Sequence, residues 1–127
     1  MLSSVQSSRR TGTCLYAAST SAGRGILHSE MPATTMKEGD VAHGLQLWVN
    51  LPRADKMCEP RYQELPAAAI PQVSEGGVTA HVIAGTALGT TSPVYTKNPV
   101  EYIHYFTAGI KMKNQWNCLS MFANVWI

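Results

Sequence analysis

The stretch "HGLQLWVNLP", residues 43–52, is the strongest fold signal in the sequence. Its apolar residues stand at every second position, with polar or aromatic residues between them: Leu45, Leu47 and Val49 alternate with Gln46, Trp48 and Asn50. A period of two is typical of a β-strand, because successive side chains point to opposite faces of a sheet. Pro52 ends the run, since proline cannot donate a hydrogen bond to a neighbouring strand. The stretch therefore predicts a strand with one face in a core.

Shorter β-rich runs lie on both sides of this strand. One strand is predicted from Ile26 to Met31, where Pro32 stops it, and another from Val78 to Ala84 between two glycines. The runs "SPVYT" and "VEYIHYF" supply two more β-rich segments. The final run "CLSMFANVWI" fits either a buried strand or a helix.

The connection over residues 52–76 contains four prolines and predicts irregular structure, with one helical turn near "RADKMCE". No long stretch shows the 3.6-residue periodicity of an amphipathic helix. Short strands separated by glycine and proline turns are typical of an all-β sandwich or barrel. We therefore expect an all-β fold.

The composition narrows the class of protein. A chain of 127 residues with 45% hydrophobic and 14% charged residues is long enough for one globular domain. A net charge of +2 without a basic stripe argues against direct binding of nucleic acid. The three cysteines, Cys14, Cys58 and Cys118, show no CxxC spacing, which argues against a disulfide framework and suits a reducing compartment. No apolar run reaches the ~20 residues of a membrane helix.

The first 24 residues contain three arginines and six serines but no acidic residue. This composition is compatible with an organelle transit segment. A flexible N-terminal extension is the preferred interpretation, because strand-like residues resume at "CLYAAS".

His28 and Glu30 stand two residues apart in "GRGILHSEMP". If this run is a strand, both side chains point to the same face. An imidazole and a carboxylate on one face form half of a site for iron or another transition metal. The two-residue spacing alone is weak evidence for a metal site. The alternative is that His28 is solvated or makes an ordinary hydrogen bond.

The remaining histidines, His43, His81 and His104, lie in or next to β-rich runs. We expect structural, hydrogen-bonded roles for them, although any of them could be brought to the His28 site by folding. Other catalytic patterns are absent: the sequence has no GxSxG, Walker or GxGxxG motif, and Cys58 has no local base. The "GRG" of residues 23–25 predicts a turn with a positive φ angle.

Five segments, taken together and in order, resemble the pirin family. They are "TSAGRGILHSEMP", "AHGLQLWVNLP", "KMCEPRYQEL", "GVTAHVIAG" and "SPVYTKNP". The resemblance covers roughly residues 19–103, and it rests on a long joint match rather than on one short motif. It implies the cupin superfamily and an all-β fold, a partial cupin-type barrel or sandwich that forms part of the N-terminal barrel of a bicupin.

The resemblance also implies a domain division and a metal. Residues 1–18 would be an unmatched Ser/Arg-rich extension, residues 19–106 an incomplete N-terminal cupin domain, and residues 107–127 a divergent tail. Pirins hold one iron ion through three histidines and one glutamate, and the resemblance assigns His28 and Glu30 as two of these ligands. The other two come from a His-x-His pattern that this sequence lacks. We therefore expect at most one iron ion (Fe2+/Fe3+) and impaired binding.

The function implied by the resemblance is that of an iron-binding, nuclear transcriptional co-regulator, which binds a transcription factor or another regulatory protein. The cytoplasm and an organelle are the alternative locations. An alternative function is that of a quercetin 2,3-dioxygenase acting on a flavonol, with Glu30 as the catalytic base. A second alternative is an inactive remnant with open sheet edges.

Overall fold

The computed structural model describes residues 2–10, 13–29, 43–107 and 118–125, which form strands with two single turns of 3-10 helix. In chain order the elements are β1 (Leu2–Arg10), β2 (Thr13–Ser21), β3 (His43–Asn50), η1 (Arg53–Asp55), β4 (Arg61–Pro66), η2 (Ala67–Ala69), β5 (Gln72–Glu75), β6 (Val78–Ala84), β7 (Thr86–Ala87), β8 (Thr90–Thr91), β9 (Val100–Thr107) and β10 (Cys118–Val125). This confirms the all-β prediction.

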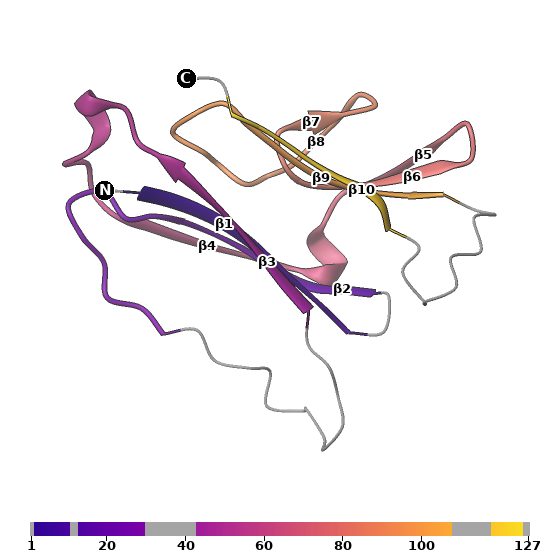
Figure 1. Ribbon diagram of the computed structural model, residues 1–127, viewed down its shortest axis with the longest axis horizontal. Helices are drawn as coiled ribbons and strands as arrows, with labels where there is room; N and C mark the ends of the chain where they lie inside the picture. Colours follow the sequence, from indigo (N-terminus) through magenta and orange to yellow (C-terminus); the bar gives the residue numbers. More distant parts are fainter. Residues whose placement is uncertain (1, 11–12, 30–42, 108–117, 126–127) are drawn as a thin grey trace, which may run out of the picture.

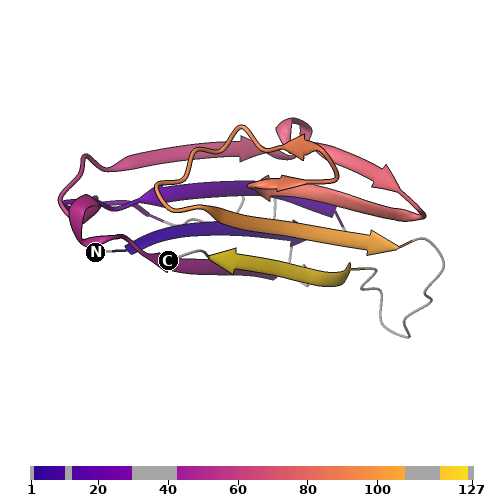
Figure 2. The same cartoon turned by 90° about the horizontal axis from the view of Figure 1, so that it is seen from above.

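The strands form two four-stranded sheets, and every pairing within them is antiparallel. Sheet A has the order β3-β1-β2-β4, and sheet B has the order β10-β9-β6-β5. The two sheets lie face to face as layers (Figure 1), and their strands run in roughly the same direction when seen from above (Figure 2). This arrangement is an aligned sandwich. The short β7 and β8 form a separate pair.

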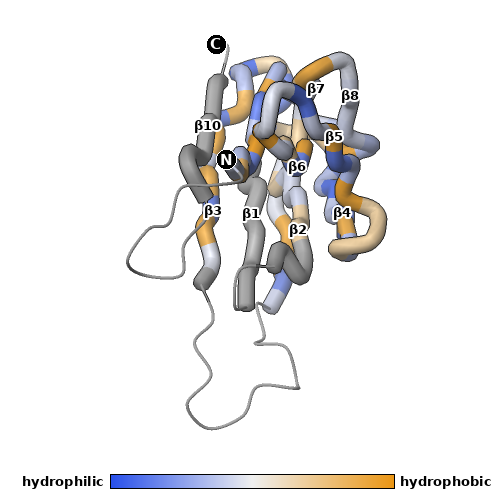
Figure 3. Tube along the Cα trace, turned by 90° about the vertical axis from the view of Figure 1, so that its right-hand side faces the viewer, coloured by the Kyte–Doolittle hydropathy of each residue, from blue (hydrophilic) through white to orange (hydrophobic). Residues whose placement is uncertain are grey.

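The main core lies between the two sheets. Ala17, Val49 and Leu65 of sheet A pack in one cluster with Ala84 and Tyr102 of sheet B, and all five are buried. Hydrophobic positions recur along β3 (Figure 3), and in β4 Leu65 is buried between the exposed Glu64 and Pro66. The strand predicted over residues 43–50 is β3, with Val49 buried and Trp48 62% exposed, whereas Leu45 near its start is 51% exposed.

A second cluster lies on the other face of sheet B. Ala80, Val82 and Ile103 are buried there together with Ala87 of β7. The short β7–β8 pair, which contacts β6, covers part of this face. The last residues of β6 are therefore buried on both faces, which explains why the burial pattern of β6 does not alternate.

Several predicted elements agree with the structure. The strand at residues 78–84 is β6, "VEYIHYF" lies in β9, and the helical turn near "RADKMCE" is η1. The sequence of "CLSMFANVWI" fits either a strand or a helix, and in the structure residues 118–125 form the strand β10. The hairpin between β5 and β6 turns at Gly76 and Gly77, both with positive φ angles, as a two-residue turn requires.

Three predictions for segments outside the His28 region were wrong. The run "SPVYT" lies in a connection rather than a strand, and the connection over residues 52–76 contains β4 and β5. The flexible N-terminal extension is also contradicted, because β1 lies inside sheet A between β3 and β2. Local composition does not predict β1 and β4, because these strands are stabilised by hydrogen bonds to strands that are distant in the sequence. The division into domains at residues 18 and 106 stays a prediction.

Within the described residues, no helix is long and apolar enough to cross a membrane.

Candidate metal-binding segment

The segment that carries His28 begins with a tight turn at residues 22–25. The Gly25 amide donates a hydrogen bond of 2.7 Å to the Ala22 carbonyl, and the Arg24 amide donates one of 2.9 Å to the Cys58 carbonyl. Gly23 has a φ of +47°, and a Cβ there would overlap the Cys58 carbonyl oxygen. Glycine is required at this point both by the backbone angle and by the close approach of the two chains. The predicted positive-φ turn is confirmed.

An ion pair ties the same turn to the segment before β4. The Arg24 guanidinium lies 2.7 Å from the Glu59 carboxylate, and the two side chains are 57% and 73% exposed. An exposed pair of this kind contributes little free energy, because water screens the attraction. The backbone contact with Cys58 is therefore the stronger constraint on where the segment starts.

His28 lies three residues beyond this turn. Residues 26–29 form no strand in the structure, and the His28 side chain is exposed. The prediction of a strand starting at Ile26 was therefore wrong, because the chain leaves sheet A at Ser21 and gains no new strand partner. Glu30, the second predicted ligand and the predicted catalytic base, lies outside the described residues. The inference that His28 and Glu30 point to the same face of a strand therefore has no support in the structure.

The structure brings two other histidines together. His81 of β6 and His104 of β9 are direct partners in the antiparallel register, and His104 is fully buried. His81 lies against Phe106, with ring centroids 4.5 Å apart, and His104 meets Tyr102 edge-on at 5.3 Å. The sequence shows that both are in strands but not that they are neighbours. His43 begins β3.

The described residues contain no group of three or more His, Cys, Asp or Glu side chains that could hold a metal ion. Of the two residues assigned to iron by resemblance, only His28 is within the described part of the chain. A single exposed imidazole does not fit a resident iron ion, which in proteins needs several ligands on a rigid frame. The described residues therefore do not fit the implied cofactor.

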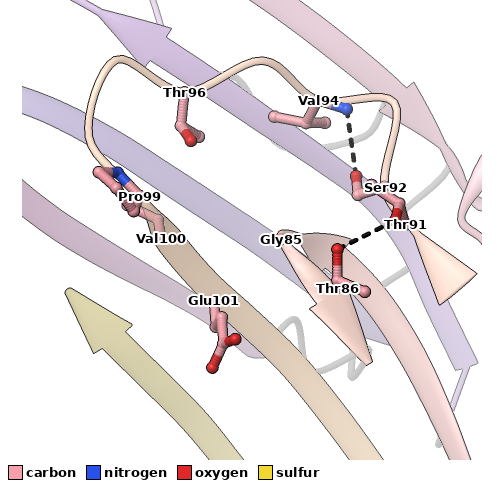
Figure 4. A pocket seen from close by; sticks show the side chains of 9 residues that line it. All are labelled: Gly85, Thr86, Thr91, Ser92, Val94, Thr96, Pro99, Val100 and Glu101. Atoms are coloured by element: carbon pink, nitrogen blue, oxygen red, sulfur yellow. Dashed lines mark hydrogen bonds between the residues drawn. The ribbon is translucent and has the colours of Figure 1, made fainter. Parts of the chain in front are cut away.

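A shallow cavity of about 260 Å3 lies between the β7–β8 pair and the start of β9 (Figure 4). Its lining residues are Gly85, Thr86, Thr91, Ser92, Val94, Thr96, Pro99, Val100 and Glu101. The Thr86 and Thr91 hydroxyls hydrogen-bond to each other at 2.9 Å. One carboxylate and several hydroxyls line the cavity, and they come from β7, β8, β9 and the connection before β9 rather than from the His28 segment.

Ser92 is the structural hydroxyl of this cavity. Its Oγ donates a hydrogen bond of 2.7 Å to the Ile83 carbonyl and accepts one of 3.1 Å from the Val94 amide, and Ser92 is 7% exposed. We expect Ser92→Ala to lower the free energy of unfolding by about 1–3 kcal/mol, because buried backbone groups lose their partner. Urea unfolding measures this. Thr86→Val, which removes only an exposed hydroxyl bond, is the control; an equal loss in both variants would contradict the prediction.

The connection before β9 is tied to the segments of sheet A. The Gln63 side chain donates to the Tyr95 carbonyl at 2.7 Å and accepts from the Tyr95 amide at 3.0 Å, in the manner of an extra strand pair. The Arg61 guanidinium lies 4.9 Å from the centre of the Tyr95 ring. Further along, the Lys97 ammonium lies 3.2 Å from the Asp55 carboxylate.

The hydrogen bond and charge of Asp55 raise the pKa of Lys97 above its usual value. A raised folded-state pKa means that the pair stabilises the fold below the unfolded pKa, and that this contribution is lost as the pH rises past about 10.5. Asp55→Asn should therefore destabilise the chain slightly at pH 8 and make little difference at pH 11. Urea midpoints of both proteins at the two pH values measure this. A gap that stays constant with pH would show that the ion pair contributes nothing.

Comparisons of the sequence with known proteins find relatives for part of the chain. No family model matches the chain. Over 84 residues, 66% of the chain, it is 56% identical to pirin of Rattus norvegicus, 55% to pirin of Homo sapiens and 50% to Pirin-1 of Arabidopsis thaliana. The matched segment belongs to the pirin family. The chain spans about 28% of the length of these three pirins.

Solved structures support the cupin-type fold of this pirin segment. The GK1651 protein of Geobacillus kaustophilus shares 33% identity, with a TM-score of 0.67 over 84% of this chain and 46% of its own. A quercetin 2,3-dioxygenase of Acinetobacter baumannii is similar at 24% identity, with a TM-score of 0.65 over 84% of this chain and 38% of its own. That second likeness shows the fold alone. The predicted partial cupin-type sandwich is confirmed.

Proposed function

We propose that this chain is a pirin-type regulatory protein of the nucleus, which binds a transcription factor or another regulatory protein and holds iron only weakly. The observation that carries the proposal is the 50–56% identity to curated pirins over 84 residues. The His28 and Glu30 motif is the part of the sequence that links the chain to iron. The anchored Gly23 turn supports it, because this turn fixes where the motif leaves the sandwich.

Protein binding is the half of this role that does not need iron. On sheet A, Trp48 and Tyr62 lie in one cross-strand row, because the register connects Trp48 to Ser4, Ser4 to Thr20 and Thr20 to Tyr62. Trp48 is 62% exposed and Tyr62 is 43% exposed. Tryptophan and tyrosine are enriched where proteins bind one another, since each buries a large area at little cost in entropy. This face supports the proposed contact with a regulatory protein.

The regulatory role is tested in a transcription reporter assay. The chain, fused to a DNA-binding domain, should change reporter output, and Trp48→Ala should remove most of that change. Leu27→Ala, which truncates a fully exposed side chain outside the strands, is the control and should have no effect. Equal output from the fusion and from the DNA-binding domain alone would contradict the proposal.

Iron binding is tested separately. After anaerobic loading with ferrous iron, we expect the purified chain to contain less than one iron per molecule. His28→Ala should lower the affinity further, by at least about tenfold, because the only described ligand is removed. Metal analysis of dialysed samples measures both. Iron at one per chain would contradict the proposed impairment, and equal iron content in the two proteins would contradict a role for His28.

We do not propose the flavonol-cleaving alternative. In that reaction Glu30 would act as base beside a metal with a complete set of ligands, and the described residues contribute only His28 to such a set. Catalysis needs its groups held within a fraction of an ångström, and an exposed irregular segment is poorly suited to that.

A further inference from the structure

His81 and His104 form a pair that the proposed function does not use. They lie directly opposite each other on β6 and β9, which are central strands of sheet B. Directly opposite residues on an antiparallel pair have Cβ atoms about 4.5–5.5 Å apart and point to the same face. Both imidazoles therefore leave the same face of the sheet at neighbouring positions.

That face is the one that looks toward sheet A. Tyr102 stands two residues before His104 on β9, so the two side chains share a face. Tyr102 belongs to the core cluster that includes Ala17 and Leu65 of sheet A. The two imidazoles are thus directed into the space between the sheets. His104 is fully buried, whereas His81 is half-buried and leaves a route to solvent.

We infer that His81 and His104 together bind one divalent transition-metal ion, such as Zn2+ or Cu2+, with water in the remaining coordination positions. Neutral imidazole is a preferred ligand of these ions. At the spacing of an opposed strand pair, one nitrogen of each ring can approach an ion to the ~2.0–2.1 Å of a zinc–nitrogen bond.

The surroundings favour this arrangement over a flexible surface pair. The strands are paired on both sides, and each imidazole has an aromatic neighbour: Phe106 beside His81 and Tyr102 beside His104. Rings held in this way lose little freedom when they bind an ion, which is the advantage of ligands placed on strands. With two protein ligands, the affinity should be lower than that of a four-ligand structural zinc site.

The pair is separate from the His28 motif. Residues 22–29 leave β2 and run along the side of sheet A that faces away from sheet B (Figure 1). Sheet A therefore stands between that segment and the histidine pair. The inference does not rest on the proposed function, and the two can fail independently.

The test is a titration of the metal-free chain with Zn2+ by calorimetry, together with electron paramagnetic resonance of the Cu2+ form, which counts nitrogen ligands. We expect one ion per chain and two coordinated nitrogens. His81→Asn should lower the Zn2+ affinity at least about tenfold and remove one nitrogen from the spectrum. Glu75→Gln, at an exposed position of β5, is the control and should leave both readouts unchanged.

His104→Asn should have the same effect as His81→Asn, but its burial makes a folding check necessary. Circular dichroism of the metal-free variants provides that check, and the half-buried His81 carries the test if His104→Asn does not fold. Absence of Zn2+ binding to the parent chain would overturn the inference. So would binding that survives His81→Asn or that is lost in Glu75→Gln, since the ion would then lie at another site.

Discussion

Gly23→Ala should lower the free energy of unfolding by about 3 kcal/mol or more, the larger of the two glycine effects expected in this chain. Two costs add at this position. An alanine at a φ of +47° is strained by its own Cβ, and that Cβ would overlap the Cys58 carbonyl oxygen, which is backbone and cannot rotate away. The hydrogen bond from the Arg24 amide to the same carbonyl would be lost as the chains separate. Urea unfolding followed by tryptophan fluorescence measures the change.

Gly76→Ala is the matched control for this prediction. Gly76 has a similar φ of +57°, but a Cβ there would meet nothing within 4 Å. Its substitution should therefore cost only the backbone strain, about 1–2 kcal/mol. Equal losses in the two variants would show that the contact with Cys58 contributes nothing, and that the turn is held by its φ angle alone.

Ile83→Ala should lower the free energy of unfolding by about 2–5 kcal/mol, because Ile83 is fully buried in the core between the sheets. The loss combines the transfer free energy of the removed atoms with the cavity left behind. Ile83 lies at the bulge of β6, so neighbouring strands cannot easily close around it. Chemical denaturation measures the effect.

A graded series makes the Ile83 prediction sharper. Ile83→Val removes one methylene and should cost about 0.5–1.5 kcal/mol, whereas Leu27→Ala, at a fully exposed position, should stay within about 0.5 kcal/mol. A parent chain that unfolds without a cooperative transition would instead support the inactive-remnant alternative, since a sandwich with a formed core unfolds cooperatively.

The strands that the sequence predicts best are those whose pattern is local. The alternating run at residues 43–50 is β3, and the glycine-bounded run at residues 78–84 is β6. The strand predicted from Ile26 does not form over residues 26–29, because high β-propensity is not enough when no neighbouring strand pairs with these residues. The reverse error occurred at β1, where a polar, serine-rich run is a strand because it lies between β3 and β2.

For the candidate site, the motif of His28 and Glu30 was visible in the sequence because its residues are close together in the chain. The close contact between Gly23 and Cys58 was not, although the glycine itself was predicted to form a positive-φ turn. The partner at Cys58 lies far along the chain, and no local pattern indicates which carbonyl a turn will meet.

By itself, the sequence determined that the chain is built of short strands and that its central segment belongs with the pirins. Both properties can be recognised from the local alternation of residue types and from matching runs of consecutive residues. Only the tertiary structure decided that His81 and His104 face each other between the sheets while the His28 segment lies beyond sheet A. The physical reason is that a period of two sets which face a side chain occupies, whereas the choice of neighbouring strand and its register depends on pairing between distant parts of the chain.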